Sequence, residues 1–157
     1  MASDTNEKVV SLLNDLIETC RDGKNGFSTA ADGAERADLK DVFTRYANQR
    51  AQFSQELEVL VTGLGGKPAD MGHVAAAAHR GWINIKTAVA GNEDKAVLSE
   101  CERGEDYAKK AYTDALKETL PQAVLSVVQR QAADVLKAHD NVRDLRDAEI
   151  AMAKSSH

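Results

Sequence analysis

Apolar residues recur along this chain at alternating steps of three and four, the spacing that places them on one face of an α-helix. The first such stripe comprises Val9, Leu13, Leu16, Cys20, Gly23, Phe27, Ala30 and Ala34. It keeps its phase through the glycine-containing stretch Asp22–Gly26, where a loop would normally shift it. The pattern therefore predicts one continuous helix over about residues 5–34, with Thr5 as its N-cap. Gly23 then lies on the packed face, where its missing side chain lets another helix approach.

Four further stripes follow the first one, and helix-ending residues separate them. These breaks fall at Gly65–Pro68, Gly91–Asn92 and Pro121. Glycine and proline at such positions end helices, because glycine adopts the C-terminal cap conformation and proline cannot continue the hydrogen-bond ladder. The stripes predict helices over about residues 37–63, 71–90, 94–119 and 121–149. The chain is therefore predicted to be all-α, and its 157 residues fit a single domain over residues 1–157.

The lengths of the predicted helices indicate how they connect. The helical pairs at about residues 5–63 and 94–147 match in size, and each has a very short turn. The segment between them is too long for a turn, and a helix of about 20 residues would span about 30 Å. The pattern thus predicts an antiparallel four-helix bundle with an additional crossover helix between its two hairpins. This is the connectivity of ferritin-like proteins.

Composition narrows the classes of function. The net charge is −5, from 25 acidic and 20 basic residues, so the basic surface of a nucleic-acid-binding protein is not expected. No apolar run reaches membrane-spanning length, and Met1–Glu7 lacks the apolar stretch of a signal peptide. A cytoplasmic location is therefore expected. Cys20 and Cys101 form no CxxC pair, and their inward positions favour a role as small apolar side chains.

Several stretches of the sequence resemble one known group of proteins. They are Leu13–Glu18, Asp22–Phe27, His79–Lys86, Glu100–Asp106 and His139–Asp147. Together they extend over nearly the whole chain, and they resemble the bacterial ferritin-like four-helix-bundle proteins of uncharacterised function. The resemblance implies a ferritin-like fold and self-association, with a homodimer as the expected form. It implies no activity.

Ferritin-like di-iron centres take a glutamate from each of two helices and a Glu-x-x-His pair from each of the other two. One half of this pattern is present, as Glu102-x-x-Glu105. The corresponding pairs on the second and last helices contain glutamine, and His139 falls outside the spacing. The candidate ligands for iron or another divalent metal are Glu102, Glu105, Asp134, Gln49 and Gln52. This incomplete set favours a degenerate metal centre without a bound cofactor.

Two charged residues on inward stripes suggest a different kind of centre. Arg50 and Glu105 lie about equally far from the turns of their hairpins, so both are expected at mid-height in the bundle. We predict that they form a buried ion pair where ferritin-like relatives carry metal, with Gln131 and Tyr46 as hydrogen-bond partners. Gly23 would leave room for the guanidinium.

The sequence also permits a simpler arrangement, in which Arg50 extends to solvent and Gln49 faces inward. Three functions remain open at this point. The first is a non-catalytic interaction or assembly module, for which no catalytic residues are predicted. The second is a metal-dependent oxidoreductase or iron-handling protein that uses the candidate ligands above. The third is a small-molecule binder with a cavity near Gly23 and Gly81.

Overall fold

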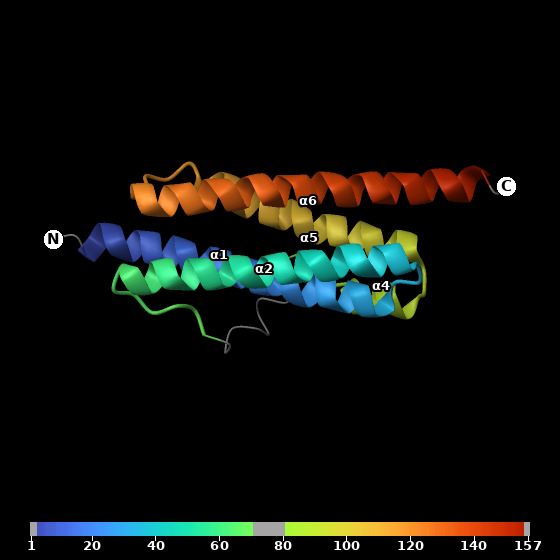
Figure 1. Cartoon of the computed structure of the whole chain (residues 1–157), viewed down its shortest axis with the longest axis horizontal. Helices are drawn as coiled ribbons and strands as arrows, with labels where there is room; N and C mark the ends of the chain where they lie inside the picture. Colours follow the sequence, from blue (N-terminus) through green and yellow to red (C-terminus); the bar gives the residue numbers. More distant parts are fainter. Residues whose placement is uncertain (1–2, 71–80, 156–157) are drawn as a thin grey trace.

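The computed structural model describes residues 3–70 and 81–155, and all regular secondary structure within these ranges is helical. The helices are α1 (Ser3–Gly33), α2 (Ala37–Gly63), α4 (Ile85–Ala90), α5 (Asp94–Ala115) and α6 (Gln122–Ser155). The four long helices run side by side along the length of the molecule (Figure 1). α1 packs on α2 and α5 packs on α6, while α1 also contacts α5. None of these helices combines the length and apolar character needed to cross a membrane.

The helix boundaries differ from the sequence prediction at several ends. α1 is continuous through Asp22–Gly26, but it begins at Ser3, so Thr5 lies inside the helix and is not its N-cap. α5 ends at Ala115 instead of near residue 119, because Lys117 and Glu118 bond to carbonyls three residues back in a tight turn. α6 continues past the expected residue 149 to Ser155.

The predicted crossover helix over residues 71–90 requires a correction. Residues 71–80 of that prediction lie outside the described residues. The following residues, 81–84, form a bend and turn instead of a helix. Gly81 has a φ of +88°, a left-handed conformation that interrupts a right-handed helix and suits glycine. Between residues 81 and 92, the helical residues are the six of α4.

The segment 81–92 packs against α1 and α5 through its tryptophan. Trp82 is 5% exposed and lies against Phe27, with ring centroids 5.0 Å apart. Gly26 of α1 and Gly104 of α5 border the indole, and a Cβ added to either would lie under 3.0 Å from it. Real Cβ atoms essentially never approach so closely. The two glycines therefore form the space that Trp82 occupies.

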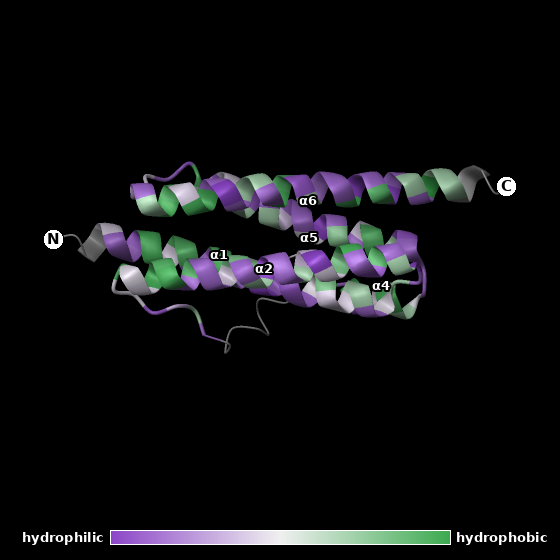
Figure 2. Cartoon of the chain, in the orientation of Figure 1, coloured by the Kyte–Doolittle hydropathy of each residue, from purple (hydrophilic) through white to green (hydrophobic). Residues whose placement is uncertain are grey.

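The apolar core consists of two clusters, one toward each end of the four packed helices. The fully buried members of the first cluster are Leu13, Ile17, Leu57, Val61, Val128 and Val135. Those of the second are Phe27, Ala30, Leu39, Phe43, Val97, Leu98, Cys101 and Val142. The middle turns of α2, between the two clusters, are mostly hydrophilic (Figure 2). The buried charged residues Arg50 and Glu105 lie between the two clusters.

Candidate functional site

A charged pair joins α2 to α5 at the centre of the protein. Arg50 donates from Nη1 to Glu105 Oε1 at 2.5 Å and from Nη2 to Oε2 at 2.6 Å. Both side chains are completely enclosed, with 1% exposure for the arginine and 0% for the glutamate. The contact is bidentate, and the planar guanidinium matches the carboxylate in shape and charge. Each helix places its residue on the inward stripe, so the pair lies between the hairpins.

Neighbouring side chains make further contacts with the guanidinium group of Arg50. Its Nε donates to Gln49 Oε1 at 3.3 Å, and its Cζ lies 5.5 Å from the centre of the Phe27 ring, a cation–π distance. A Cβ at Gly23 would lie 3.2 Å from Nη1, so this glycine provides room for the group. Burial disfavours the charged guanidinium, but the ion pair with Glu105 outweighs burial and raises the pKa of Arg50. The arginine therefore remains charged.

A chain of hydrogen bonds lies beside the ion pair. Tyr112 donates its hydroxyl proton to Gln131 Oε1 at 2.7 Å, so the Cys20 thiol, 3.1 Å away, is the donor to the tyrosine oxygen. The Gln131 amide donates to the carbonyl of Phe53 at 3.3 Å and to Glu56 Oε1 at 3.1 Å. Glu56 is partly exposed. The chain thus leads from a buried thiol to the surface between α2 and α6.

Burial determines the protonation of this network. It raises the pKa of the Cys20 thiol from 9.0 to about 11. Burial likewise raises the pKa values of Cys101 and Tyr112 well above their ordinary values. Both cysteines are free thiols. At neutral pH they are protonated, and a protonated thiol is neither a good nucleophile nor a metal ligand.

The raised pKa of Cys20 predicts a loss of stability in alkali. Between about pH 9 and 11 the folded protein keeps a proton that the unfolded chain releases, so stability falls as the pH rises. A shift of about two units corresponds to roughly 2–3 kcal/mol over that interval. Denaturant unfolding at a series of pH values measures this slope. In the Cys20→Ala variant the slope should be shallower, and an unchanged slope would contradict the assignment to Cys20.

Tyr112 is expected to stabilise the protein through its hydroxyl group. Tyr112→Phe leaves Gln131 Oε1 and the Cys20 thiol without partners in a buried site, at a cost of about 1–3 kcal/mol. Tyr46→Phe is the matched control, because the Tyr46 hydroxyl only accepts a bond from Asn141 near the surface. That control should change stability by no more than about 0.5 kcal/mol. Equal effects of the two variants in denaturant unfolding would argue against the buried network.

The structure brings the predicted centre residues Arg50 and Glu105 into contact, and Gln131 lies nearby, where it accepts a hydrogen bond from Tyr112. Tyr46 is not part of this centre: its ring packs on Phe27, with centroids 5.3 Å apart, and its hydroxyl bonds Asn141. The arrangement with Arg50 in solvent is wrong, since the side chain is buried. Sequence reasoning missed Tyr112, although it lies seven residues after Glu105 on the same inward stripe.

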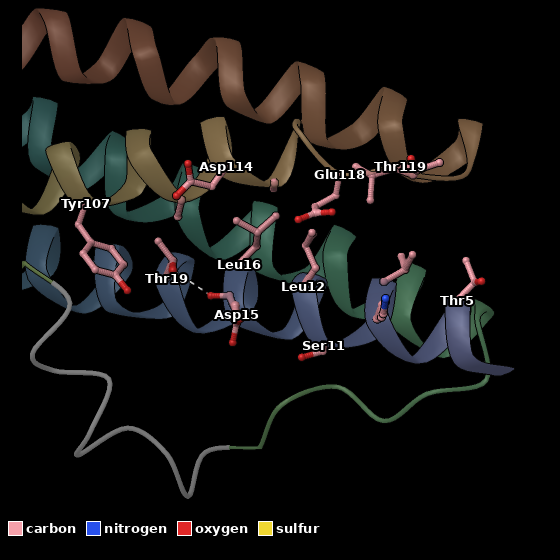
Figure 3. A pocket seen from close by; sticks show the side chains of 15 residues that line it. Thr5, Ser11, Leu12, Asp15, Leu16, Thr19, Tyr107, Asp114, Glu118 and Thr119 are labelled. Atoms are coloured by element: carbon pink, nitrogen blue, oxygen red, sulfur yellow. Dashed lines mark hydrogen bonds between the residues drawn. The ribbon is translucent and has the colours of Figure 1, made fainter.

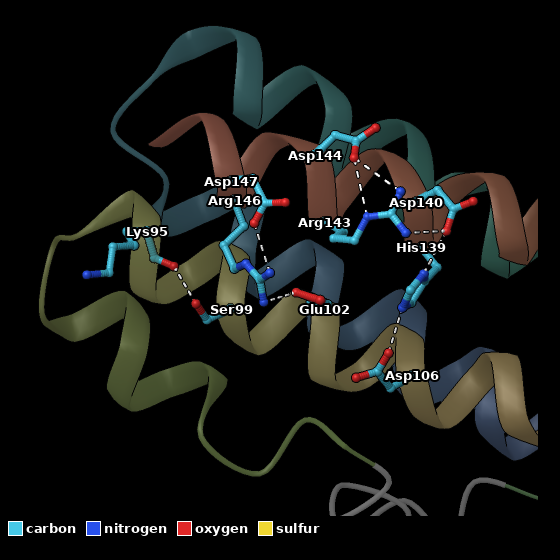
Figure 4. A network of polar contacts seen from close by, with 10 residues as sticks. All are labelled: Lys95, Ser99, Glu102, Asp106, His139, Asp140, Arg143, Asp144, Arg146 and Asp147. Atoms are coloured by element: carbon cyan, nitrogen blue, oxygen red, sulfur yellow. Dashed lines mark hydrogen bonds and ion pairs between the residues drawn. The ribbon is translucent and has the colours of Figure 1, made fainter. Parts of the chain in front are cut away.

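The candidate metal ligands do not converge on one site. Both carboxylate oxygens of Glu105 bond Arg50, while Glu102 forms an ion pair with Arg146 (Figure 4). The remaining three candidates, Gln49, Gln52 and Asp134, line a groove between α2 and α6. Within residues 3–70 and 81–155, no three His, Cys, Asp or Glu side chains are grouped to hold a metal ion. The residues present therefore do not fit a di-iron centre, because Arg50 and Arg146 already form ion pairs with Glu105 and Glu102, the carboxylates that would have to bind the ions.

His139 belongs to a second polar network, between α5 and α6. Its Nε2 lies 2.6 Å from Asp106 Oδ1 and its Nδ1 lies 3.0 Å from Asp140 Oδ1 (Figure 4). The hydrogen bond with His139 lowers the pKa of Asp140, and Arg143 adds to this effect. Both ring nitrogens of His139 contact carboxylates, and the contact with Asp106 links α6 to α5.

Other parts of the described chain lie directly against Gly23 and Gly81, near which a cavity was expected. The Arg50 side chain fills the space at Gly23. At Gly81, the Cα of Gly104 and the carbonyl oxygen of Arg103 lie 2.9 and 3.0 Å from where a Cβ would be. Each glycine thus permits a close contact within the protein.

The protein is thus all-helical, and its two hairpins, α1–α2 and α5–α6, meet at the ion pair of Arg50 and Glu105, which is buried in the core. The chain belongs to the family described as domain of unknown function DUF2383, whose profile matches residues 8–118. No curated protein matches the chain. The family carries no assigned activity.

Proposed function

We propose that this protein is a ferritin-like helical bundle with a degenerate metal centre, and that it acts as a non-catalytic interaction or assembly module. In this proposal the protein is a cytoplasmic homodimer, and residues 64–92 are the crossover between its two hairpins. The alternative, a di-metal oxidoreductase or iron-handling protein, requires carboxylates that are free to bind ions.

The bidentate contact between Arg50 and Glu105 is the observation that carries the proposal. It occupies the middle of the bundle, where ferritin-like proteins carry their metal ions. A guanidinium in this position supplies the positive charge that the glutamate would otherwise obtain from a metal. Releasing Glu105 for metal binding would leave Arg50 buried without a partner, which costs several kcal/mol. The ion pair therefore competes directly with metal at this level of the bundle.

The chemistry of the remaining buried groups agrees with a non-catalytic role. The thiols of Cys20 and Cys101 are protonated at neutral pH, as their raised pKa values require. His139 is engaged by Asp106 and Asp140 on both ring nitrogens. The two buried thiols and His139 thus offer neither a thiolate nucleophile at neutral pH nor an imidazole without partners.

Metal analysis combined with solution mass tests the proposal. The protein is produced in iron-supplemented medium and purified without chelator, alongside a known di-iron bundle protein as positive control. We expect far less than one iron per chain, and light scattering should give twice the chain mass of 17.0 kDa. About two irons per chain would overturn the degenerate centre in favour of the metal-dependent alternative. A strictly monomeric mass would overturn the homodimer.

A further inference from the structure

Helix α5 contacts both α1 and α6, and its two seams differ in character. Along α1 a groove opens between the helices, and the side chains of Leu12, Leu16 and Ala115 are among those that line it (Figure 3). Along α6 lies a network of polar contacts, and His139, at 6% exposure, is the most buried of the residues drawn there (Figure 4). A change of charge at His139 therefore acts on the packing of α6 against α5.

The two contacts of His139 require two hydrogen-bond donors. Its Nε2 lies 2.6 Å from Asp106 Oδ1 on α5, and its Nδ1 lies 3.0 Å from Asp140 Oδ1 on α6. An ionised carboxylate only accepts, so each ring nitrogen has to carry a proton for both contacts to be hydrogen bonds. A neutral imidazole has a single N–H, and its other nitrogen would direct a lone pair at a carboxylate oxygen. The geometry is therefore that of the positively charged imidazolium.

The groups around Asp140 keep this carboxyl ionised. The hydrogen bond with His139 lowers the pKa of Asp140, and the charges of Arg143 on α6 and Lys109 on α5 add to this effect. Arg143 Nη1 lies 3.4 Å from Asp140 Oδ1. Asp140 therefore has a second cationic partner, which remains when the charge of the imidazole is lost.

The other charged groups at this level of the bundle come from α6 and α2. Arg146 of α6 is close enough to Asp106 for their charges to interact. On α2, Arg50 is paired with Glu105, and Arg45 lines the groove between α2 and α6. Aspartate, glutamate, lysine and arginine ordinarily keep their charge across neutral pH, whereas histidine is the residue type that can change it there. The imidazole is thus the group through which pH acts on this network.

We propose that His139 is a pH-sensitive tie between α5 and α6, which donates to Asp106 and Asp140 together as an imidazolium and loses the Asp140 contact when it releases a proton to solvent. The released proton is that of Nδ1, because the Nε2 contact is the shorter one and Asp140 retains Arg143. The neutral donor that remains toward Asp106 makes a weaker bond than the charged one. The stability that His139 contributes therefore falls as the pH rises, because the folded chain holds this proton more strongly than the unfolded chain does. This regulation goes beyond the proposed assembly role and does not depend on it.

Nuclear magnetic resonance of the full-length chain labelled with ¹⁵N-histidine tests the proposal during a pH titration. The chain has four histidines, and His139→Gln identifies the signals of this imidazole by their loss. We expect both ring nitrogens to be protonated at the acid end and the remaining proton to lie on Nε2 at the alkaline end. A remaining proton on Nδ1 would overturn the assignment of the stronger contact to Asp106.

Two charge-removing variants test whether the carboxylates hold the proton. Asp106→Asn and Asp140→Asn should each lower the proton affinity of the imidazole about two- to fivefold, which moves its titration midpoint down by about 0.3–0.7 pH units. Asp147→Asn is the matched control, because it removes the same charge from α6 about 10 Å further along the helix, beyond the screening length of about 8 Å at physiological salt. The control should leave the midpoint unchanged. Equal shifts in all three variants, or no shift in the first two, would overturn the tie.

Thermal unfolding gives a second readout of the same proposal. Glutamine at position 139 keeps a neutral donor but cannot take up a proton, and circular dichroism first establishes that the His139→Gln variant is folded. The melting temperature of the wild type should exceed that of the variant most at about pH 5.5, and the difference should shrink by about 2–4 °C by about pH 8.5. A difference that does not change with pH would overturn the proposal. None of these outcomes bears on the iron content or the mass of the protein, so the tie and the proposed function are tested separately.

Discussion

Replacing Arg50 by methionine is expected to lower the free energy of unfolding by about 3–5 kcal/mol. The substitution keeps most of the side-chain volume but leaves the Glu105 carboxylate at 0% exposure without its bidentate partner. A carboxylate in that position must remain charged in an apolar core or take up a proton, and either costs free energy. Urea unfolding followed by far-ultraviolet circular dichroism measures the loss. A change below about 1 kcal/mol would contradict the buried ion pair.

A double variant separates the cost of an orphaned charge from the net contribution of the pair. Arg50→Met combined with Glu105→Leu removes both charges, and we expect most of the lost stability to return. The matched surface control is Lys110→Met, which breaks the exposed pair with Asp114 and should have no measurable effect. A double variant as unstable as Arg50→Met alone would mean that packing, not charge, determines the stability of the centre.

Gly104→Ala is expected to destabilise the protein by about 2–4 kcal/mol. The added methyl group would lie inside the contact distance of the Trp82 indole, which Gly26 confines on its other side. Loss of a buried tryptophan's packing costs about 3–5 kcal/mol, and the better helix propensity of alanine offsets about 1 kcal/mol of this. The emission of Trp82, the one tryptophan of the chain, should move to longer wavelength as the indole enters water.

Gly63→Ala is the matched control for this prediction. Gly63 is also helical, but outside its own helical turn no atom of residues 3–70 or 81–155 lies within 4 Å of where its Cβ would be. The control should therefore have neutral or slightly increased stability and unchanged tryptophan emission. If the two alanine variants behave alike, the two glycines next to Trp82 do not determine its position.

Predictions from the sequence agreed with the structure where one helical face repeated without interruption. The stripe from Val9 to Ala34 stays in phase through Asp22–Gly26, and α1 is continuous there. Phase is a property of neighbouring residues along one helix, so it can be read without knowing what that helix contacts. The prediction for residues 71–90 was wrong over residues 81–84, because the left-handed Gly81 and the insertion of Trp82 depend on Gly26 and Gly104 in other helices.

The same distinction, between a pattern along one helix and contacts between helices, applies to the buried ion pair and the residues around it. Height along each hairpin, counted from its turn, was enough to predict that Arg50 and Glu105 lie at one level. Rotation about the helix axes could not be predicted so well. Tyr46 and Tyr112 both occupy inward stripes, yet only Tyr112 faces Cys20 and Gln131, while Tyr46 faces Asn141. Which groups each ring contacts is determined by the packing of the neighbouring helices.

The sequence by itself determined the helical class of this protein, the continuity of its first helix and the common level of two opposite charges in its core. Those properties follow from periodicity and chain length, which are local. Tertiary structure alone decided that Arg146 pairs with Glu102 and that two glycines enclose Trp82. Each of these features depends on side chains from helices far apart in the sequence, whose relative rotation follows from close packing.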